Sequence, residues 1–275
     1  MTSSPPARSF DWGNLRLRIV SGLVLAAVGA AGVILGGAPL LVLVAVAVAL
    51  LSLEWGRMCA TRGPAAVAAL ISVGALLAVF TAYTGWWRSS WGVLAIAALV
   101  AALLARTTRR AERALDVAFG VAYLGAPAIA FLWLRSGATG LAWTVILVAS
   151  AWLADIAAYA GGNWLGGPKL WPRVSPKKTW AGFLFGLAAA ALTGWIAASV
   201  VKRFGGPRPE HAITIGLVTG LATMGGDLVE SVLKRRFGVK DSGDLIPGHG
   251  GLLDRVDGLM TAALVMAAVR WALHA

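Results

Sequence analysis

Residues 226–258, GDLVESVLKRRFGVKDSGDLIPGHGGLLDRVDG, gather charge in a chain that has little of it. Only 13% of the 275 residues are charged, yet this segment holds half of the 12 acids and one of the three histidines. It lies between two long apolar stretches. Burying charge near a bilayer is costly, so clustered ionisable residues there indicate a functional site. The acids are Asp227, Glu230, Asp241, Asp244, Asp254 and Asp257, and the cations are Lys234, Arg235, Arg236, Lys240 and Arg255.

The rest of the chain is apolar enough to reside in a membrane. Hydrophobic residues make up 59% of it, and several continuous apolar runs approach or exceed the ~20 residues that cross a ~30 Å hydrocarbon core. A β-barrel would alternate apolar and polar residues, which these runs do not. We therefore expect an all-α, polytopic integral membrane protein with about nine transmembrane helices. The expected spans are 17–36, 39–55, 65–84, 91–105, 116–134, 141–161, 180–201, 211–233 and 257–273.

Positive charge favours one orientation of these spans. Most of the 24 Lys and Arg residues fall in alternate segments, near 8–18, 57–62, 106–113, 169–178 and 234–255. Cytoplasmic loops are enriched in Lys and Arg, so we expect these segments and the N-terminus in the cytoplasm. Topology then accounts for the net charge of +12, and we expect no nucleic-acid partner. Tryptophans near span ends are predicted to anchor at the membrane interface: Trp55, Trp86, Trp87, Trp91, Trp164 and Trp180.

The site is expected in the second half of the chain. The acids before residue 140 lie at or near span ends (Asp11, Glu54, Glu112 and Asp116), and all the others follow residue 150. We therefore predict transmembrane scaffold helices over 1–140 and catalytic helices with cytoplasmic-side loops over 141–275. Cys59 is the only cysteine, which excludes an intrachain disulfide and a cysteine-based zinc site. A metal site would use oxygen ligands, which favours Mg²⁺.

One face of the span at 211–233 is polar. Asp227, Glu230, Ser231 and Lys234 are spaced i, i+3, i+4 and i+7, which places them on one side of a helix. An unpaired charge at mid-membrane costs about 2.5–3.5 kcal/mol, so this face should line a polar cavity. An internal ion pair between Glu230 and Lys234, spaced i to i+4, is an equally good explanation for those two residues.

The glycine-rich turn at 247–251 precedes a second acidic pair. Its backbone can approach a ligand closely, and its successive N–H groups could form an anion-binding nest beside a helix N-terminus. Favourable placement of an acid in a first helical turn would explain Asp254 alone. It does not explain why Asp257, one turn later, also enters a membrane span.

A third polar segment runs from Ser175 to Thr179. Ser175 and Pro176 suit the N-cap and first position of a helix, which would place Lys177 and Lys178 in its first turn. Lysines there oppose the helix dipole, and a bound phosphate would resolve that conflict. Lysines at a membrane boundary that obey the positive-inside rule are an equally good explanation. With carboxylates for Mg²⁺ elsewhere, the combination favours phosphoryl or nucleotidyl transfer at the membrane face, with a lipid as the other reactant.

The charged segment resembles the signature of the phosphatidate cytidylyltransferases, also called CDP-diacylglycerol synthases. Segments around Asp155 and at 175–182 also look like the family pattern, with Asn163 standing where a basic residue is expected, and the resemblance covers about residues 150–260. The residues that carry it are Ser231-x2-Lys234-Arg235-x4-Lys240-Asp241-x-Gly243-x2-Ile246-Pro247-Gly248-His249-Gly250-Gly251-x2-Asp254-Arg255-x-Asp257.

The resemblance implies that CTP and phosphatidate, a membrane lipid, give CDP-diacylglycerol and pyrophosphate with one or two Mg²⁺ ions. It implies metal binding by Asp227 and Asp254, and we add Lys234, Asp257 and Asp241 as catalytic candidates. Substrate binding is expected from Lys177, Lys178, Ser175, Thr179, Ser231, Arg235, Lys240, His249, Gly250, Gly251 and Arg255. His249 could equally contact phosphate or only fix its loop. The expected location is a bacterial inner membrane, and oligomeric state, a homodimer among the options, stays open.

The sequence disfavours two other classes of function. An ion-coupled transporter would spread its acids across the depth of the bilayer, often in repeated halves, whereas these acids gather in one region. An alcohol phosphotransferase that consumes CDP-diacylglycerol would need an Asp-Gly-x2-Ala-Arg motif, which this sequence lacks.

Overall fold

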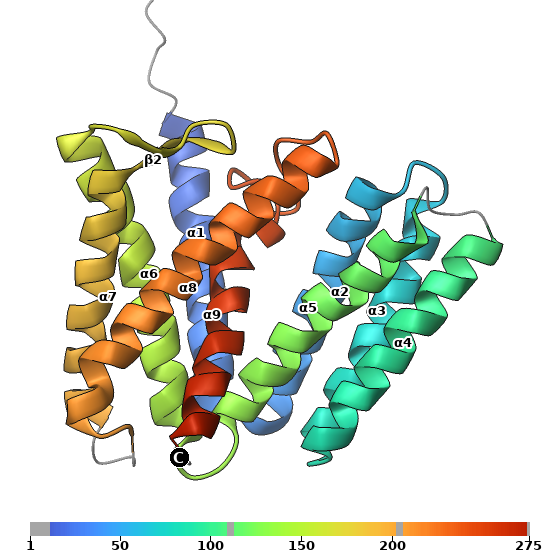
Figure 1. The fold of residues 1–275 in the computed structure, drawn as a ribbon, viewed down its shortest axis with the longest axis horizontal. Coiled ribbons are helices and arrows are strands. Elements are labelled where there is room, and N and C mark those ends of the chain that lie inside the picture. Colours follow the sequence, from blue (N-terminus) through green and yellow to red (C-terminus); the bar gives the residue numbers. More distant parts are fainter. Residues whose placement is uncertain (1–11, 109–112, 202–205, 274–275) are drawn as a thin grey trace, which may run out of the picture.

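The computed structural model describes residues 12–108, 113–201 and 206–273, and within them the chain is almost entirely helical (Figure 1). Part of the positive charge counted above, in residues 1–11, 109–112 and 202–205, lies outside the described residues. The elements are α1 (Trp12–Leu35), α2 (Gly37–Cys59), α3 (Pro64–Tyr83), α4 (Trp87–Thr107), α5 (Ala114–Arg135), α6 (Gly140–Leu165), β1 (Lys169–Trp171), β2 (Ser175–Thr179), α7 (Trp180–Val201), α8 (Pro209–Arg236) and α9 (Leu253–Ala272).

The prediction of an all-α membrane protein is confirmed. Within the described residues, the seven helices α2 to α8 are long and apolar enough to cross a membrane, and large apolar side chains cover their outer faces. Each expected span corresponds to one helix. The count of nine spans is approximate, because the apolar part of α1, Ile19–Leu35, is shorter and α9 begins with charged residues.

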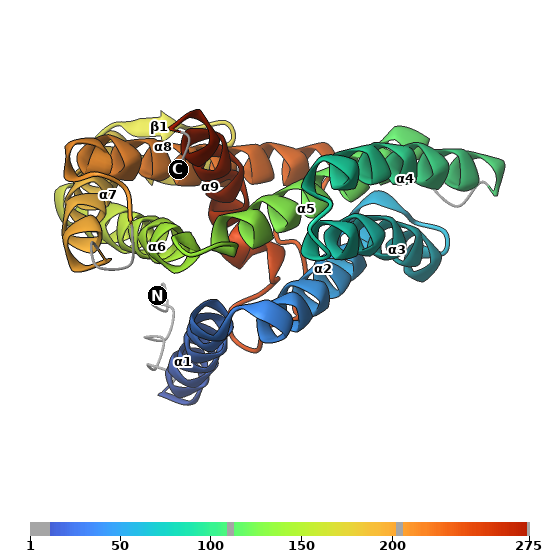
Figure 2. The same cartoon turned by 90° about the horizontal axis from the view of Figure 1, so that it is seen from below.

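The helices form two groups. Helices α2 to α5 pack against one another, α6 to α9 form the second group, and α5 contacts α9 between them (Figure 2). The C-terminal end of α8 reaches across, so that Leu233 belongs to the core of the first group. Small residues bring α7 and α8 together: a Cβ on Gly194 would lie only 2.6 Å from the Ala212 carbonyl oxygen. Close backbone approach of this kind is typical of helix packing in membranes.

Trp55 is a correction to the expected aromatic belt. Its side chain is fully buried, and its indole N–H donates to the Asp116 carbonyl oxygen at 3.0 Å. Its ring centroid lies 5.5 Å from that of Phe237, just beyond α8. The large Trp55 ring fills the junction between α2, α5 and α8. Its indole N–H has a hydrogen-bond partner there, as a buried tryptophan usually does.

The segment before α7 differs from the expected helix start. Ser175, Lys177 and Lys178 lie in β2, which pairs antiparallel with β1, and Lys169 faces Thr179. The α7 cap is Thr179, whose hydroxyl accepts the Gly182 N–H at 3.1 Å. A helix begun at Ser175 would leave that cap unused and would move Gly182 from its contact with α6, where a Cβ would meet the Ala158 carbonyl oxygen at 2.6 Å.

The polar connections gather at one end of the molecule. Figure 1 shows the β1–β2 hairpin and the C-terminal end of α8 at the top, with the C-terminal end of α9 at the bottom. Two arginines at the lower end have structural partners. Arg135 donates to the Val33 carbonyl oxygen at 2.6 Å, at the end of α1, and Arg270 donates to the Leu134 carbonyl oxygen at 2.8 Å, at the end of α5. The hairpin and the end of α8, which were expected on one membrane face, lie at the same end of the bundle.

Candidate active site

The site forms where α8 and α9 cross. A Cβ on Gly226 would lie 2.7 Å from the Asp257 carbonyl oxygen, and one on Gly258 would lie 2.8 Å from Oδ1 of Asp227. Only glycine permits this approach, because Cβ atoms do not come so close to other heavy atoms. The crossing places the Asp227 carboxylate directly against Gly258 of α9, which follows Asp254 by one helical turn. Asp257, on the same helix, is buried.

The β1–β2 hairpin brings a lysine to Asp227. Nζ of Lys178 lies 2.8 Å from Oδ2 of Asp227, and both side chains are mostly buried. Neighbouring residues of a strand point to opposite sides, so Lys177, one position earlier, is directed elsewhere and is exposed. The two lysines, which spacing could not distinguish, therefore occupy different surroundings.

A second lysine connects α8 to α9. Nζ of Lys234 lies 2.6 Å from Oε2 of Glu230 and 2.6 Å from Oδ1 of Asp254. The internal pair on α8 therefore exists, as one explanation required, but it is part of a network that includes Asp254. Oδ2 of Asp254 also accepts hydrogen bonds from the Ser242 backbone N–H at 3.2 Å and from the Ser242 hydroxyl at 3.1 Å.

Sequence reasoning missed Glu54, which lies five residues before the C-terminal end of α2. Oε1 of Glu54 accepts the Leu252 N–H at 2.7 Å, Oε2 accepts the Leu253 N–H at 2.8 Å, and the Ser242 hydroxyl donates to Oε2 at 3.2 Å. The side chain is 1% exposed. A carboxylate at a helix N-terminus satisfies free N–H groups and complements the helix dipole. The N-terminal end of α9 is therefore occupied by the protein's own anion. An acid closing an apolar span was the available signal, but nothing local connects residue 54 to residue 252.

The glycine-rich turn is closed on itself. The N–H groups of His249 and Gly250 both donate to the Ile246 carbonyl oxygen, at 2.9 and 3.1 Å. Positive φ angles of 77° at Gly248 and 86° at Gly250 make this turn possible. The expected anion-binding nest is wrong at these positions, because these donors are used inside the turn. Nδ1 of His249 lies 3.0 Å from the Ser21 hydroxyl of α1, which favours the loop-fixing role for this histidine.

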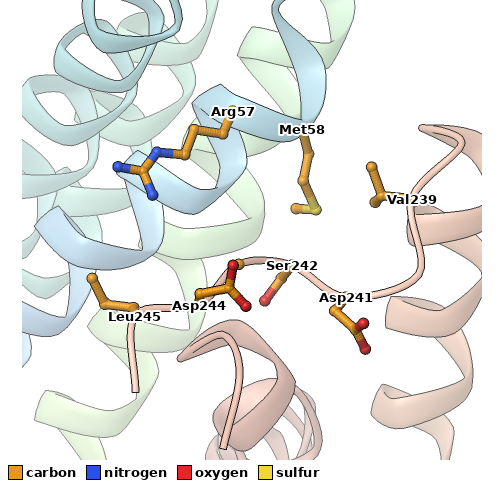
Figure 3. Close-up of a pocket in the computed structure, with 8 residues that line it drawn as sticks. Arg57, Met58, Val239, Asp241, Ser242, Asp244 and Leu245 are labelled. Atoms are coloured by element: carbon orange, nitrogen blue, oxygen red, sulfur yellow. The ribbon is translucent and has the colours of Figure 1, made fainter. Parts of the chain in front are cut away.

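The remaining predicted residues lie around this network. Ser231 shares the α8 face, Arg255 donates to the His249 carbonyl oxygen at 2.8 Å, and Lys240 is exposed. Arg235 donates to the Val239 carbonyl oxygen at 3.5 Å. Asp241 lines a cavity of about 400 Å³ between α2 and residues 239–245 (Figure 3), beside the Ser242 loop rather than at the Lys178–Asp227 pair. The structure therefore does not place Asp241 with the other candidate acids.

Acids outnumber cations at the α8–α9 crossing. Asp155, on α6, lies within electrostatic range of Asp227, Lys178 and Arg255, and Asp257 lies within range of Asp227 and Glu230. Oε1 of Glu230 is buried without a hydrogen-bond partner among the described residues. This surplus of oxygen ligands suits an added hard cation.

The geometry limits the type of metal site that these residues could form. In the part of the chain that the structure describes, no three His, Cys, Asp or Glu side chains are grouped to hold a metal. Mg²⁺ commonly takes one or two protein carboxylates and completes its shell with water and substrate phosphates. The residues present fit a site in which one or two carboxylates hold the metal and water and substrate phosphates complete its shell.

Comparisons with known proteins identify the family of the chain. The model of the cytidylyltransferase family matches residues 16–273. A phosphatidate cytidylyltransferase of Brucella suis is 40% identical over 268 residues, which is 92% of each chain. One from Staphylococcus aureus is 37% identical over 202 residues, 70% of this chain and 75% of its own. One from Synechocystis is 47% identical over 131 residues, 46% of this chain and 43% of its own. The chain belongs to the cytidylyltransferase family and is a nucleotidyltransferase.

Proposed function

We propose that the protein transfers the cytidylyl group of CTP to phosphatidate, giving CDP-diacylglycerol and pyrophosphate. The observation that carries the proposal is the pair of lysine–aspartate contacts, Lys178–Asp227 and Lys234–Asp254, on facing elements at one end of a membrane-embedded bundle. Opposite charges held this close can bind phosphates through the lysines and a cation through the carboxylates. The relatives' names supply the two substrates.

Magnesium is the cation we propose for this site. Asp227 and Asp254 would hold it, with Asp257 and Asp155 near enough to add negative charge. When bound, Mg²⁺ would supply positive charge that polarises the phosphates of CTP. Because the lysines already pair with these carboxylates, ion and substrate would bind together, with each lysine turning from its aspartate to a phosphate.

The chemistry needs no strong base from the protein. The second pKa of a phosphate monoester is near 6, so the phosphate of phosphatidate is largely ionised at pH 7. One of its oxygens attacks the α-phosphorus of CTP, the bond from that phosphorus to the oxygen bridging the β-phosphorus breaks, and pyrophosphate leaves. The protein's part is to hold both reactants in line and to neutralise charge on the transferring group. Lys178 is best placed for this role, with Lys177, Lys240 and Arg255 as further cations.

The membrane arrangement supports the same reaction. A lipid would reach the site from the bilayer and CTP from the aqueous side, so the site should lie near an interface. The hairpin and residues 237–252 lie together at one end of the helix bundle, which fits that requirement (Figure 1). The Lys- and Arg-rich connections at this end favour the cytoplasmic face of the inner membrane. Homodimer formation remains part of the proposal to be tested by size analysis in detergent.

A release assay tests the reaction. Purified protein is given CTP labelled in its terminal phosphates, with Mg²⁺, and with or without phosphatidate in mixed micelles. We expect labelled pyrophosphate only when phosphatidate is present, in equal amount to the CDP-diacylglycerol formed. Pyrophosphate release that does not depend on phosphatidate would refute the proposal. So would the absence of pyrophosphate release from folded protein given both substrates. An alcohol phosphotransferase or a transporter would release none.

A further inference from the structure

Glu54 meets Asp254 through a shared hydroxyl. The Ser242 hydroxyl lies 3.2 Å from Oε2 of Glu54 and 3.1 Å from Oδ2 of Asp254. A hydroxyl has one hydrogen, so it can donate fully to only one of the two carboxylates at a time. If Asp254 takes a new partner, the hydroxyl can turn entirely to Glu54 and stay satisfied. Glu54 therefore lets the Ser242 hydroxyl keep an acceptor when Asp254 changes partners.

Two glycines of the charged segment make room for this carboxylate. A Cβ on Gly243 would lie 3.2 Å from Oε1 of Glu54, and one on Gly251 would lie 3.1 Å from the same oxygen. Both positions are tighter than ordinary side-chain contacts. Glu54 also accepts hydrogen bonds from the Leu252 and Leu253 N–H groups at the start of α9. Leu253 directly precedes Asp254. The start of α9 is thus fixed in position by α2.

We propose that Glu54 is a positioning residue for the reaction: it holds the start of α9 and the Ser242 hydroxyl so that Asp254 faces Lys234 and the substrates. This inference rests on the proposed function. It also gives the N-terminal helices a defined part in the site, since α2 supplies the carboxylate. Removing a group that orients a metal-ligand residue commonly lowers activity or metal affinity about 10- to 100-fold.

The test replaces Glu54 by Gln and by Ala. Glutamine keeps one acceptor oxygen but turns an NH₂ donor toward a backbone N–H or the Ser242 hydroxyl, so one contact is lost. Alanine loses all three contacts. We expect kcat to fall about 10- to 100-fold for Glu54→Gln and further for Glu54→Ala, with the KM for CTP changed less than threefold. The Mg²⁺ concentration for half-maximal rate should rise in both variants.

Hydrogen exchange provides a readout that does not depend on activity. In Glu54→Gln, peptides covering residues 242–256 should exchange faster, because one of the contacts that hold the start of α9 and the Ser242 loop to Glu54 is lost, while peptides of α6 and α7 stay unchanged. Two matched variants serve as controls. Ser52→Ala removes a buried hydroxyl on the same helix that bonds to the Val48 carbonyl oxygen, and Asp116→Asn removes a buried carboxylate that pairs with Arg236. Both should keep kcat within threefold of the wild type.

Each combination of exchange and kcat supports or overturns a stated part of the inference. Faster exchange with lowered kcat in Glu54→Gln, and normal kcat in both controls, supports the inference. Unchanged exchange at 242–256 overturns the anchoring role, and faster exchange with normal kcat overturns the positioning role. A wild-type protein that exchanges slowly at 242–256 but never makes CDP-diacylglycerol refutes the proposed function instead, and with it the catalytic part of this inference. If Glu54→Ala does not fold, Glu54→Gln alone decides.

Discussion

Lys178 and Lys177 are neighbours in the sequence, but the structure predicts that they have very different importance. Replacing Lys178 by Ala removes the cation 2.8 Å from Asp227, whereas Lys177→Ala removes an exposed cation from the other side of β2. Loss of one charged or hydrogen-bonding group that stabilises a transition state typically lowers kcat 10²- to 10³-fold, about 2.7–4 kcal/mol. We expect that loss for Lys178→Ala and less than about a tenfold loss for Lys177→Ala.

Stability should change much less than catalysis in the Lys178 variant. The Lys178 and Asp227 side chains are 30% and 24% exposed, so water can partly rehydrate the carboxylate left behind. The expected cost is about 1–2 kcal/mol of unfolding free energy, between surface pairs and fully buried ones. Lys178→Arg keeps the charge and should retain more activity than Lys178→Ala.

The assay is the initial rate of CDP-diacylglycerol formation in mixed micelles, with CTP varied at saturating phosphatidate. Thermal unfolding followed by circular dichroism checks that each variant is folded. A Lys177→Ala defect as large as that of Lys178→Ala would refute the reasoning from strand geometry. So would a folded Lys178→Ala variant with wild-type kcat/KM.

Two further predictions concern the helix crossing and the metal. Gly258→Ala should lower both the melting temperature and activity, because its Cβ would lie 2.8 Å from Oδ1 of Asp227 and 2.9 Å from the Thr223 carbonyl oxygen. Gly225→Ala, where nothing lies within 4 Å of the added Cβ, should be neutral or gain about 0.5–1 kcal/mol in stability, and equal melting curves for the two variants would contradict the proposed close crossing. Chelation of divalent ions with EDTA should abolish turnover while leaving helical content unchanged, and added Mg²⁺ should restore the rate. Full activity in excess EDTA would show that the reaction needs no divalent metal.

Much of the fold could be predicted because membrane spans are a local property of sequence. The expected span 180–201 coincides with α7, and the others differ from their helices by a few residues at each end. The polar face of α8 was also predictable, because the i, i+3, i+4, i+7 spacing fixes which side chains share a side. Lys234 on that face does bind Glu230, and it reaches Asp254 as well.

The contacts that could not be predicted join residues distant in the sequence. Glu54 binds the start of α9 about two hundred positions later, and no local pattern records that pairing. Trp55, placed by its span-end position at the membrane interface, is instead buried against Phe237. Ser175 and Pro176 have the residue types of a helix start, but the strand pairing of β1 with β2 and the Thr179 cap overrode that local preference. In each case tertiary packing chose between locally acceptable alternatives.

The central claim is that the carboxylates and lysines between α8 and α9 carry out the transfer of a cytidylyl group to lipid. The most direct measurement follows cytidine-labelled CTP into the lipid phase, in the wild-type protein and in Asp227→Asn, with both proteins shown to be folded. We predict phosphatidate-dependent labelling of the lipid by the wild type and none above background by Asp227→Asn. Labelling by the variant at the wild-type rate would contradict the claim.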